Sequence, residues 1–405
     1  MKKIGIILVF ILLLTSCGSA KEATQLAEIG EKIEVNSTNL NDESFINYLD
    51  KLDLFSASIS SNLCAEKEVN TCISPLSIFM ALSITSVASE GTSQDRLLNF
   101  LGVNANDIKT HTPLLYSTVN QSTNTSIVQV TNSIWLNETL KYNQDVVEEL
   151  AKNQYCYPYQ VDFKNKNKDA NKAIQNFIKE QTNGLIDKNF ELEEDTFLAL
   201  INTLYFKDGW SDKLQKKKYS FKNANGTEKT TEFLQGKYIL GVQASEENYS
   251  HFYTRTNRGY SLYFIVPKNN VSLKNVFTKE TIYHVSNYQY DKPKNTYTRC
   301  IFPSFTAKYD EDIYPKLGLE CVSLDRLVKE DEPNAIKKVD HVTKLEVNDE
   351  GIEGAAVTVV ADAPTSAGPE IEEKFYYDFL VDRSFGYLIL DTHGIPLFTG
   401  VVTNC

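Results

Sequence analysis

Glycine and proline are scarce in this chain, at 18 and 11 of 405 residues. That scarcity excludes collagen-like and low-complexity sequences. Positive charge is also in short supply, because 41 Lys and Arg stand against 53 Asp and Glu and leave a net charge of −12. A surface of that sign argues against nucleic-acid binding and against docking to a membrane through a basic patch.

Histidine occurs only five times, and the motifs of common enzymes are missing. The sequence has no GxSxG elbow, no HExxH, no phosphate-binding Walker loop and no GxGxxG after a strand. Ser74, Ser77 and His341 come nearest to a Ser–His pair. The two serines bracket Pro75 at the start of an apolar helix, however, where capping is the simpler role. We therefore expect no enzyme activity and no cofactor.

The seven cysteines form no CxxC pair, and no histidine cluster lies beside them in the sequence. This pattern predicts no zinc site and no other metal site. Cys64 and Cys72 flank a short polar turn. They form either a disulfide, in an oxidising compartment, or two plain buried thiols, and the spacing leaves both open.

The N-terminus has the anatomy of a signal peptide. Lys2 and Lys3 precede the apolar run Ile4–Leu14, which makes about 16 Å of helix and is too short for a bilayer core of about 30 Å. Leu14 to Cys17 resembles a bacterial lipobox, in which the cysteine is acylated and becomes the mature N-terminus. The alternative is an ordinary secretory signal with a cysteine nearby by chance.

The lipobox implies three segments. Residues 1–16 are the signal peptide, residues 17–43 a polar, lipidated tether that begins at Cys17, and residues 44–405 the folded domain. We expect an extracytoplasmic protein that acyl chains on Cys17 anchor to a bacterial membrane.

The body of the chain reads as one α+β domain. Apolar spacing predicts a helix over Ser44–Ile59, another over Ala170–Gln181 with Asp169 as its N-cap, and a third that begins at Gln144. Helices dominate the first half and strands the second. Several predicted strands are apolar at nearly every position, so at least one sheet should be covered on both faces. The predicted strands are 126–136, 196–206, 260–267, 300–308, 342–347, 385–390 and 397–402.

The segment 349–370 is the most informative. Between residues 351 and 369 it contains no Lys, no Arg and no aromatic residue. Small residues at its start precede the strand-prone Val357–Ala361, so it suits either a loop or a strand. With Ile352 facing inward, period two places Gly354, Ala356, Thr358 and Val360 on the same face. Taken alone, the segment reads first as a mobile linker before the C-terminal strands.

Several motifs in the same order resemble the serpin family over residues 44–405. They are Ile73–Ile78, Ala88–Thr92, Thr182–Ile186, Asn202–Trp210, Glu346–Gly351 and Leu397–Val402. The resemblance implies an α+β fold with helices packed on a large central mixed β-sheet, smaller sheets and an exposed reactive loop, here 349–370. Cys405 stands where the family usually ends in Pro.

The resemblance also implies a mechanism. A serine protease attacks the reactive loop and forms an acyl-enzyme, and the freed loop then inserts into the central sheet and distorts the protease. Position by position, the hinge is Gly351, Ile352, Glu353, Gly354, Ala355 and Ala356. The gate cluster, where the strands part, is Ser74, Ser77, Asn202, His341 and, at the top, Trp210.

Counting the usual loop length from Gly351 places the scissile bond at Thr365–Ser366. Thr365 is small and follows Pro364, so the expected partners are elastase-like or subtilisin-like serine proteases with a small primary pocket, not trypsin-like ones. Cuts at Val360–Ala361 or Ser366–Ala367 suit the same class. We expect a monomer that binds no nucleic acid and reaches the membrane through its lipid.

Some residues depart from the family pattern. Ile352 replaces a small Thr or Ser and is expected to slow insertion. Gly354 replaces an Ala, and Asp362 falls on the inward face, where burying its charge is costly. The region 104–118 contains only Lys109 as a permanent positive charge, so heparin-type activation is not expected. The competing readings are a non-inhibitory binding or structural protein of the same fold and, more weakly, a surface hydrolase.

Overall fold

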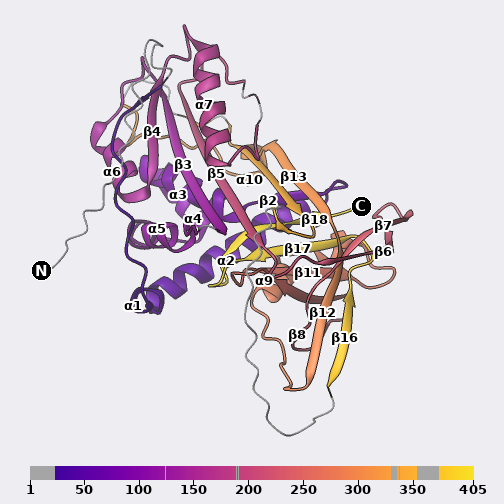
Figure 1. Ribbon diagram of the computed structural model, residues 1–405. Helices are drawn as coiled ribbons and strands as arrows, with labels where there is room; N and C mark the ends of the chain where they lie inside the picture. The colour runs from indigo at the N-terminus through magenta and orange to yellow at the C-terminus, as the bar shows by residue number, and fades with distance from the viewer. Residues whose placement is uncertain are drawn as a thin grey trace, which may run out of the picture.

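The computed structural model describes residues 23–123, 125–187, 189, 191–329, 335–336, 338–353 and 374–405. Over these residues the chain is an α+β protein with three sheets, as the sequence predicts (Figure 1). No helix in this part of the chain is long and apolar enough to cross a membrane.

Most of the long helices precede residue 182. α2 is capped by Asp42, whose carboxylate accepts the backbone N–H of Ser44 and Phe45, and α3 by Ser74, with Pro75 in its first turn. α7 begins at Asn167, so the prediction of Asp169 as its N-cap is wrong: Asp169 lies in the first turn, where a carboxylate also favours a helix. The helices are α1 Ser37–Leu40, α2 Glu43–Cys64, α3 Pro75–Ala88, α4 Gly91–Leu101, α5 Ala105–Val119, α6 Gln144–Gln154, α7 Asn167–Gln181, α8 Leu273–Val276, α9 Lys279–Ser286 and α10 Tyr314–Leu317.

The largest sheet has seven strands in the order β1-β4-β3-β5-β15-β14-β13. It is mixed, because β3 and β4 are parallel and the other neighbours antiparallel. Its strands are β1 Thr24–Gln25, β4 Cys156–Val161, β3 Ser126–Asn137, β5 Leu198–Gly209, β15 Gly351–Ile352, β14 Asp340–Val347 and β13 Phe305–Asp312. The single predicted strand 300–308 is wrong, because the chain breaks at Ser304 into β12 and β13, which belong to different sheets.

Two smaller sheets complete the fold. The six-stranded sheet has the order β2 Thr71–Ile73, β18 Pro396–Val402, β17 Phe385–Leu390, β11 Ser261–Pro267, β10 Tyr249–Arg255 and β9 Ala244–Ser245. Every residue of β17 and β18 is buried, which confirms the expected sheet covered on both faces. The five-stranded sheet contains β16 Phe375–Leu380, β12 Thr296–Pro303, β7 Glu228–Gln235, β6 Gln215–Lys222 and β8 Ile239–Leu240.

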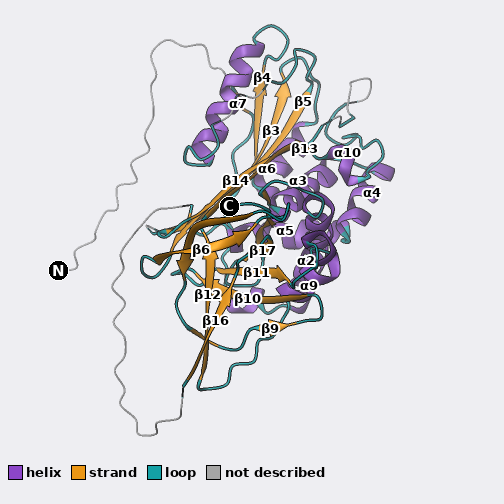
Figure 2. Cartoon of the chain, turned by 90° about the vertical axis from the view of Figure 1, so that its right-hand side faces the viewer, coloured by secondary structure: helices purple, strands orange, loops and turns teal. Residues whose placement is uncertain are grey.

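Helices cover both faces of the seven-stranded sheet. Figure 2 shows α7 on one side of the sheet and α2, α3, α4 and α5 on the other. Under α7, Phe177 packs edge-on against Trp135 of β3 and Tyr159 of β4. Cys64 and Cys72 lie in the core on the opposite side as buried free thiols, which decides between the two open readings. Burial raises the pKa of Cys72 to about 12.

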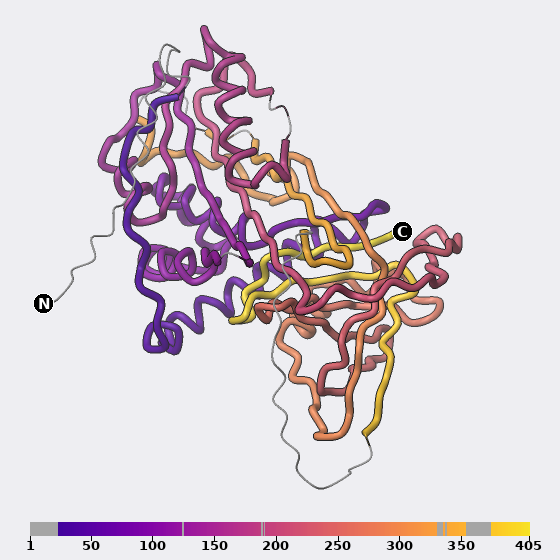
Figure 3. Tube along the Cα trace, viewed as in Figure 1, coloured from indigo at the N-terminus to yellow at the C-terminus, as the bar shows by residue number. Residues whose placement is uncertain are grey.

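The N-terminal segment corrects the prediction of a free tether over residues 17–43. From residue 23 onward it lies along the outer edge of the large sheet and over α6 and α5 (Figure 3). β1 pairs with β4, the Gly30 N–H donates to the Ala151 carbonyl at 3.2 Å, and the Ile33 N–H donates to Ser117 Oγ at 3.0 Å. The folded domain therefore begins before residue 44. Cys17 lies outside the described residues.

Candidate functional site

The seven-stranded sheet is open along its middle. β5 pairs with β3 from Leu198 to Asp208, and β14 pairs with β13 along its whole length. Between the facing edges of β5 and β14, the structure describes only the two-residue strand β15, at the top. Below β15, the described parts of β5 and β14 form no ladder with each other. Their facing backbone groups are left to be paired by another strand.

The seated end of the hinge is Gly351–Ile352. Gly351 is opposite Gly209, and Ile352 is opposite both Asp208 and Val347. A Cβ atom at Gly351 would lie 2.5 Å from the Asp208 carbonyl oxygen, so only glycine fits this close approach. The Ile352 side chain is fully buried in the main core. Its bulk is therefore accommodated in the sheet at this position.

Glu353 ends the short strand. Its φ of +72° is left-handed, which turns the chain out of the extended conformation. Its carboxylate accepts a hydrogen bond from the Tyr205 hydroxyl at 3.1 Å and lies 3.5 Å from Lys207 Nζ. Burial raises the pKa of Tyr205 to about 12, so the phenol remains a proton donor at neutral pH. Both side-chain partners lie on β5, while the Glu353 backbone N–H donates to the Glu346 carbonyl of β14, so Glu353 joins the end of the hinge to both strands.

The turn before the hinge is fastened to the end of β5. The Trp210 indole N–H donates to the Asn348 carbonyl at 2.7 Å, and the Trp210 backbone N–H donates to the Glu350 carbonyl at 3.0 Å. Trp210 is buried and packs edge-on against Phe302. The structure thus places Trp210 at the top of the opening.

Asp349 forms an ion-paired anchor beside this turn. Its carboxylate lies 2.9 Å from Lys213 Nζ and 3.0 Å from Lys216 Nζ. Burial opposes ionisation, but the two ammonium groups prevail and lower the pKa of Asp349. Lys216 lies in strand β6. Sequence reasoning missed both lysines, because their spacing shows nothing of the partner more than 130 positions away.

Ser74, Ser77 and His341 meet under the gap. The backbone N–H of Ser74 donates to His341 Nε2 at 3.1 Å, and Ser74 Oγ accepts the Ser77 N–H at 3.2 Å as a helix cap. Burial lowers the pKa of His341 to about 3, so the ring is neutral. His341 thus bonds the backbone of Ser74 and not its hydroxyl, which is not the arrangement of a nucleophile and its base.

Asn202 lies level with His341 across the gap. Ile352 is opposite both Asp208 and Val347, and six residues back along each strand are Asn202 and His341. Asn202 Nδ2 donates to Asn132 Oδ1, while its buried Oδ1 atom has no hydrogen-bond partner. The Ser77 hydroxyl, also buried, has none either. The gate therefore contains two unsatisfied polar atoms, and Asn132 is a member that the sequence analysis missed.

A cavity of about 630 Å³ follows the lower part of the gap. Its walls include Ala199 and Ile201 of β5, Val339 and Val342 at the start of β14, and Ile178 at the end of α7. The structure therefore leaves space, as well as free backbone groups, between β5 and β14. The predicted hinge residues Gly354, Ala355 and Ala356 and the predicted scissile pair Thr365 and Ser366 lie outside the described residues.

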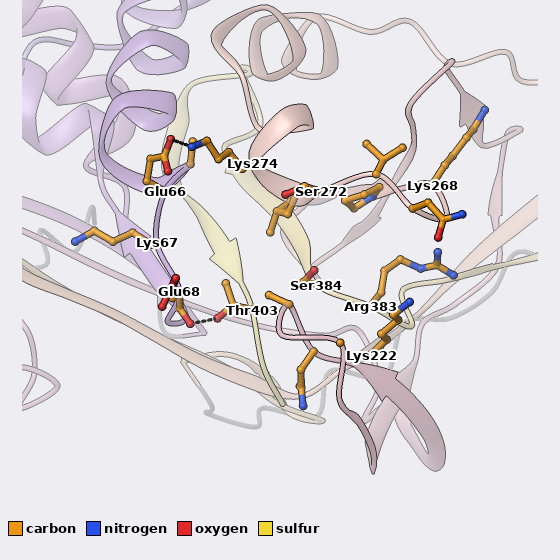
Figure 4. Close-up of a pocket in the computed structure, with 18 residues that line it drawn as sticks. Glu66, Lys67, Glu68, Lys222, Lys268, Ser272, Lys274, Arg383, Ser384 and Thr403 are labelled. Atoms are coloured by element: carbon orange, nitrogen blue, oxygen red, sulfur yellow. Dashed lines mark hydrogen bonds and ion pairs between the residues drawn. The ribbon is translucent and has the colours of Figure 1, made fainter.

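A second pocket, of about 340 Å³, has no such relation to the gap (Figure 4). Lys222, Lys268 and Arg383 lie on one side of it, and Lys274 points at Glu66, with which it forms an ion pair. Arg383 pairs with Asp382. The lining carries five basic and two acidic side chains, and among these charges only Lys274 and Glu66 form an ion pair.

Comparison with known proteins gives a consistent result. The family described as serpin (serine protease inhibitor) matches residues 50–405. An uncharacterized serpin-like protein of Methanosarcina acetivorans is 26% identical over 366 residues, which are 85% of this chain and 83% of that protein. Alpha-1-antitrypsin of Meriones unguiculatus is 26% identical over 352 residues, 83% of this chain and 84% of that protein.

Solved structures share the fold. The thermophilic serpin tengpin in its native state has a TM-score of 0.74 at 22% identity, covering 95% of this chain and 100% of that one. A cleaved serpin, Serpin 42Da, has a TM-score of 0.73 at 18% identity, covering 89% of this chain and 99% of that one. At these identities the likeness shows the architecture alone.

Proposed function

This chain belongs to the serpin family, whose members are generally protease inhibitors rather than enzymes, and on that premise we propose that it is a suicide-substrate inhibitor of serine proteases. The observation that carries the proposal is the opening between β5 and β14 with the hinge seated at its top. After cleavage, the residues that follow Ile352 enter this opening as a new central strand.

The register of β15 supports the proposed path. A strand that continues antiparallel from Ile352, one residue per level, brings Thr358 level with Asn202 and His341. Thr358 shares the parity of the buried Ile352, so its hydroxyl faces the core side of the sheet. There it meets the unsatisfied Asn202 Oδ1 and Ser77 Oγ atoms. Insertion thus satisfies polar groups that the uncut protein leaves unpaired.

The driving force is large enough. A strand inserted between two neighbours gains roughly 15 ladder hydrogen bonds at about 0.5–1.5 kcal/mol each, on the order of 10–20 kcal/mol in all. That gain is comparable with the whole stability of an ordinary domain. A gain of this size is enough to drive insertion once the loop is cut.

The proposed targets are elastase-like and subtilisin-like proteases. Thr365 before the scissile bond suits a shallow primary pocket, and the segment 351–369 offers no Lys or Arg to a deep acidic pocket. The inhibitor acts as a monomer, because the hinge, the opening and the gate all belong to one chain.

We further propose that acyl chains on Cys17 hold the protein at the outer side of a bacterial membrane, where it meets foreign proteases. Expression in a bacterium with labelled palmitate tests this, with Cys17→Ala as the control. Label on the unchanged chain and none on the variant supports the anchor. Equal label on both, or on neither, overturns it.

Complex formation tests the inhibitory function. Incubation with an elastase and with a subtilisin should give a covalent complex that survives denaturing electrophoresis, whereas trypsin should give little. Ile352→Arg should yield cleaved chain without complex, because a buried cation cannot remain in the sheet. Ile352→Val, which keeps an apolar side chain at this buried position, is the matched control and should still form the complex.

Two results would decide for the other readings. Clean cleavage of the unchanged chain without any complex would make it a non-inhibitory member of the fold. Turnover of peptide substrates by the protein alone would make it a hydrolase.

A further inference from the structure

A cluster of metal-binding side chains lies outside the site described above. Glu246 follows β9, His251 lies in β10 and His284 lies in the last turn of α9. One ligand atom from each lies within 4.8 Å of the other two, and this is the one such set of three among the residues with described positions. Glu246 Oε1 is 3.6 Å from His251 Nε2 and 3.5 Å from His284 Nε2.

His251 is the unusual member. The residue is fully buried, and its Nε2 atom has no hydrogen-bond partner. Its other ring nitrogen, Nδ1, lies 2.7 Å from the Tyr290 hydroxyl. With the proton on Nδ1 donated to Tyr290, the Nε2 lone pair points toward Glu246 and His284.

The spacing fits a shared ion better than direct contact. Separations of 3.5 and 3.6 Å exceed ordinary hydrogen-bond lengths. Two ligands on one tetrahedral zinc, with bonds of about 2.0–2.1 Å, lie about 3.3 Å apart. A small movement of the partly exposed Glu246 and His284 side chains therefore brings all three groups within bonding distance of a single ion.

We propose that Glu246, His251 and His284 form a Zn²⁺ site. Two imidazole nitrogens and one carboxylate oxygen are a donor set that zinc accepts in proteins. The fourth position faces solvent, on the side of the Glu246 and His284 side chains, which are 36% and 45% exposed. This proposal departs from the prediction of no metal site, which considered only histidines beside cysteines.

The surroundings of His251 resemble the outer shell of a metal site. Tyr290 fixes the ring through Nδ1 and acts as a positioning residue. The Tyr288 ring packs edge-on against His251 with centroids 4.6 Å apart, and Tyr249 lies on another side at 5.7 Å. A bound ion would link the turn between β9 and β10 to helix α9 and so stabilise the folded state.

Isothermal titration of the full, untagged, chelator-treated chain with ZnCl₂ tests the site. The expected result is one ion per chain for the unchanged protein and binding weakened at least about 100-fold by His284→Ala or Glu246→Gln. Both side chains are partly exposed, so these variants should fold. His393→Ala is the matched control, because His393 pairs with Asp391 elsewhere and its loss should leave binding unchanged. Absence of binding to the unchanged chain, or equal binding to His284→Ala, would overturn the proposal.

Two further readouts separate this site from adventitious binding. Tyr290→Phe keeps the packed ring and removes only the hydroxyl, and should weaken Zn²⁺ binding by about tenfold. Co²⁺ should give the visible spectrum of nitrogen and oxygen ligands. A sulfur-to-cobalt charge-transfer band that disappears in Cys321→Ser would assign the ion to the exposed Cys321 and would also overturn the proposal.

Discussion

The seven-stranded and six-stranded sheets differ in how completely the backbone groups of their central strands are hydrogen-bonded. In the six-stranded sheet, β17 is paired on both sides and every residue of β17 and β18 is buried. In the seven-stranded sheet, β5 and β14 are each paired along one edge and share only the two residues of β15 on the other. One sheet is complete, and the other leaves its central pairing unmade.

The outer and inner edges of the seven-stranded sheet differ in the same way. The outer edge at β4 is covered by β1 and by the segment that continues over α6. Covering an outer edge prevents pairing with other chains. Among the described residues, no strand pairs with the inner edges of β5 and β14 below β15. Under the proposed function, this opening is where cleavage supplies the missing strand.

Cleavage should give the largest effect. Cutting the chain at Thr365–Ser366 should raise the free energy of unfolding by on the order of 10 kcal/mol and the unfolding temperature by roughly 20 °C or more. The gain follows from completing the interrupted sheet. Thermal unfolding of the cut and uncut protein, followed by circular dichroism, measures it. An unchanged unfolding temperature would contradict the inserted-strand mechanism.

Three variants sharpen this test. Thr358→Arg should be cut equally well but gain little stability, because its charge would fall beside His341, whereas Thr358→Ser should behave like the unchanged chain. Gly386→Ala in the six-stranded sheet would place a Cβ 2.3 Å from the Phe277 ring. Gly386→Ala should lower the free energy of unfolding by about 1–3 kcal/mol in both the uncut and the cut protein, because this position lies outside the opened sheet. A gain equal to wild type in Thr358→Arg would show that the register is different.

The next effect concerns the N-terminal segment that covers the outer edge of the seven-stranded sheet. A Cβ at Gly30 would lie 2.0 Å from the Lys152 carbonyl oxygen of α6. Gly30→Val should therefore displace the N-terminal segment and lower the free energy of unfolding by about 2–3 kcal/mol. Glu34→Ala, at an exposed position of the same segment, is the control and should cost less than about 0.5 kcal/mol. Equal stability of the two variants in denaturant melts would mean that the segment is not docked in solution.

The docking of the N-terminal segment could not be predicted from the sequence. Its small polar residues read as a tether, because its few apolar contacts, such as Ile29 and Val35, lack a helical or strand period. The candidate hinge and gate residues could be named from motifs in Ile73–Ile78, Asn202–Trp210 and Glu346–Gly351. The Lys213, Lys216 and Asn132 contacts could not, because they depend on strand register.

The cluster at Glu246, His251 and His284 escaped the sequence for a related reason. His251 and His284 are 33 positions apart, on a strand and a helix, and no local spacing indicates that α9 places them together. Hydrophobic periodicity predicts which residues share a face of one helix or strand. A family motif predicts contacts only between residues that belong to the motif. Contacts between elements that pack face to face need the tertiary structure.

The neutral gate histidine gives a smaller, pH-dependent effect. The unfolded chain takes up a proton at His341 near pH 6.5, while the folded ring stays neutral down to about pH 3. Stability from this group is therefore complete above pH 6.5 and falls as the pH drops, by about 2 kcal/mol between pH 6.5 and 5. Denaturant melts across this range measure how the free energy of unfolding depends on pH. For His341→Gln this dependence should be shallower, by the amount that corresponds to the uptake of about one proton on unfolding. An identical slope would mean that the ring is protonated in the folded gate.

The smallest expected effect concerns the ion pair between Glu353, at the end of the hinge, and Lys207 of β5. Glu353 lies 3.5 Å from Lys207 Nζ, and the two side chains are only 11% and 24% exposed. A double-mutant cycle with Glu353→Gln and Lys207→Met should give a coupling energy of about 0.5–1 kcal/mol in the uncut protein, falling as salt is raised. After the cut, Glu353 becomes part of a continuous strand whose ladder holds it regardless of this pair. The single variants should then no longer differ from the unchanged chain, and a coupling that persisted in the cut form would mean that the end of the hinge does not extend on cleavage.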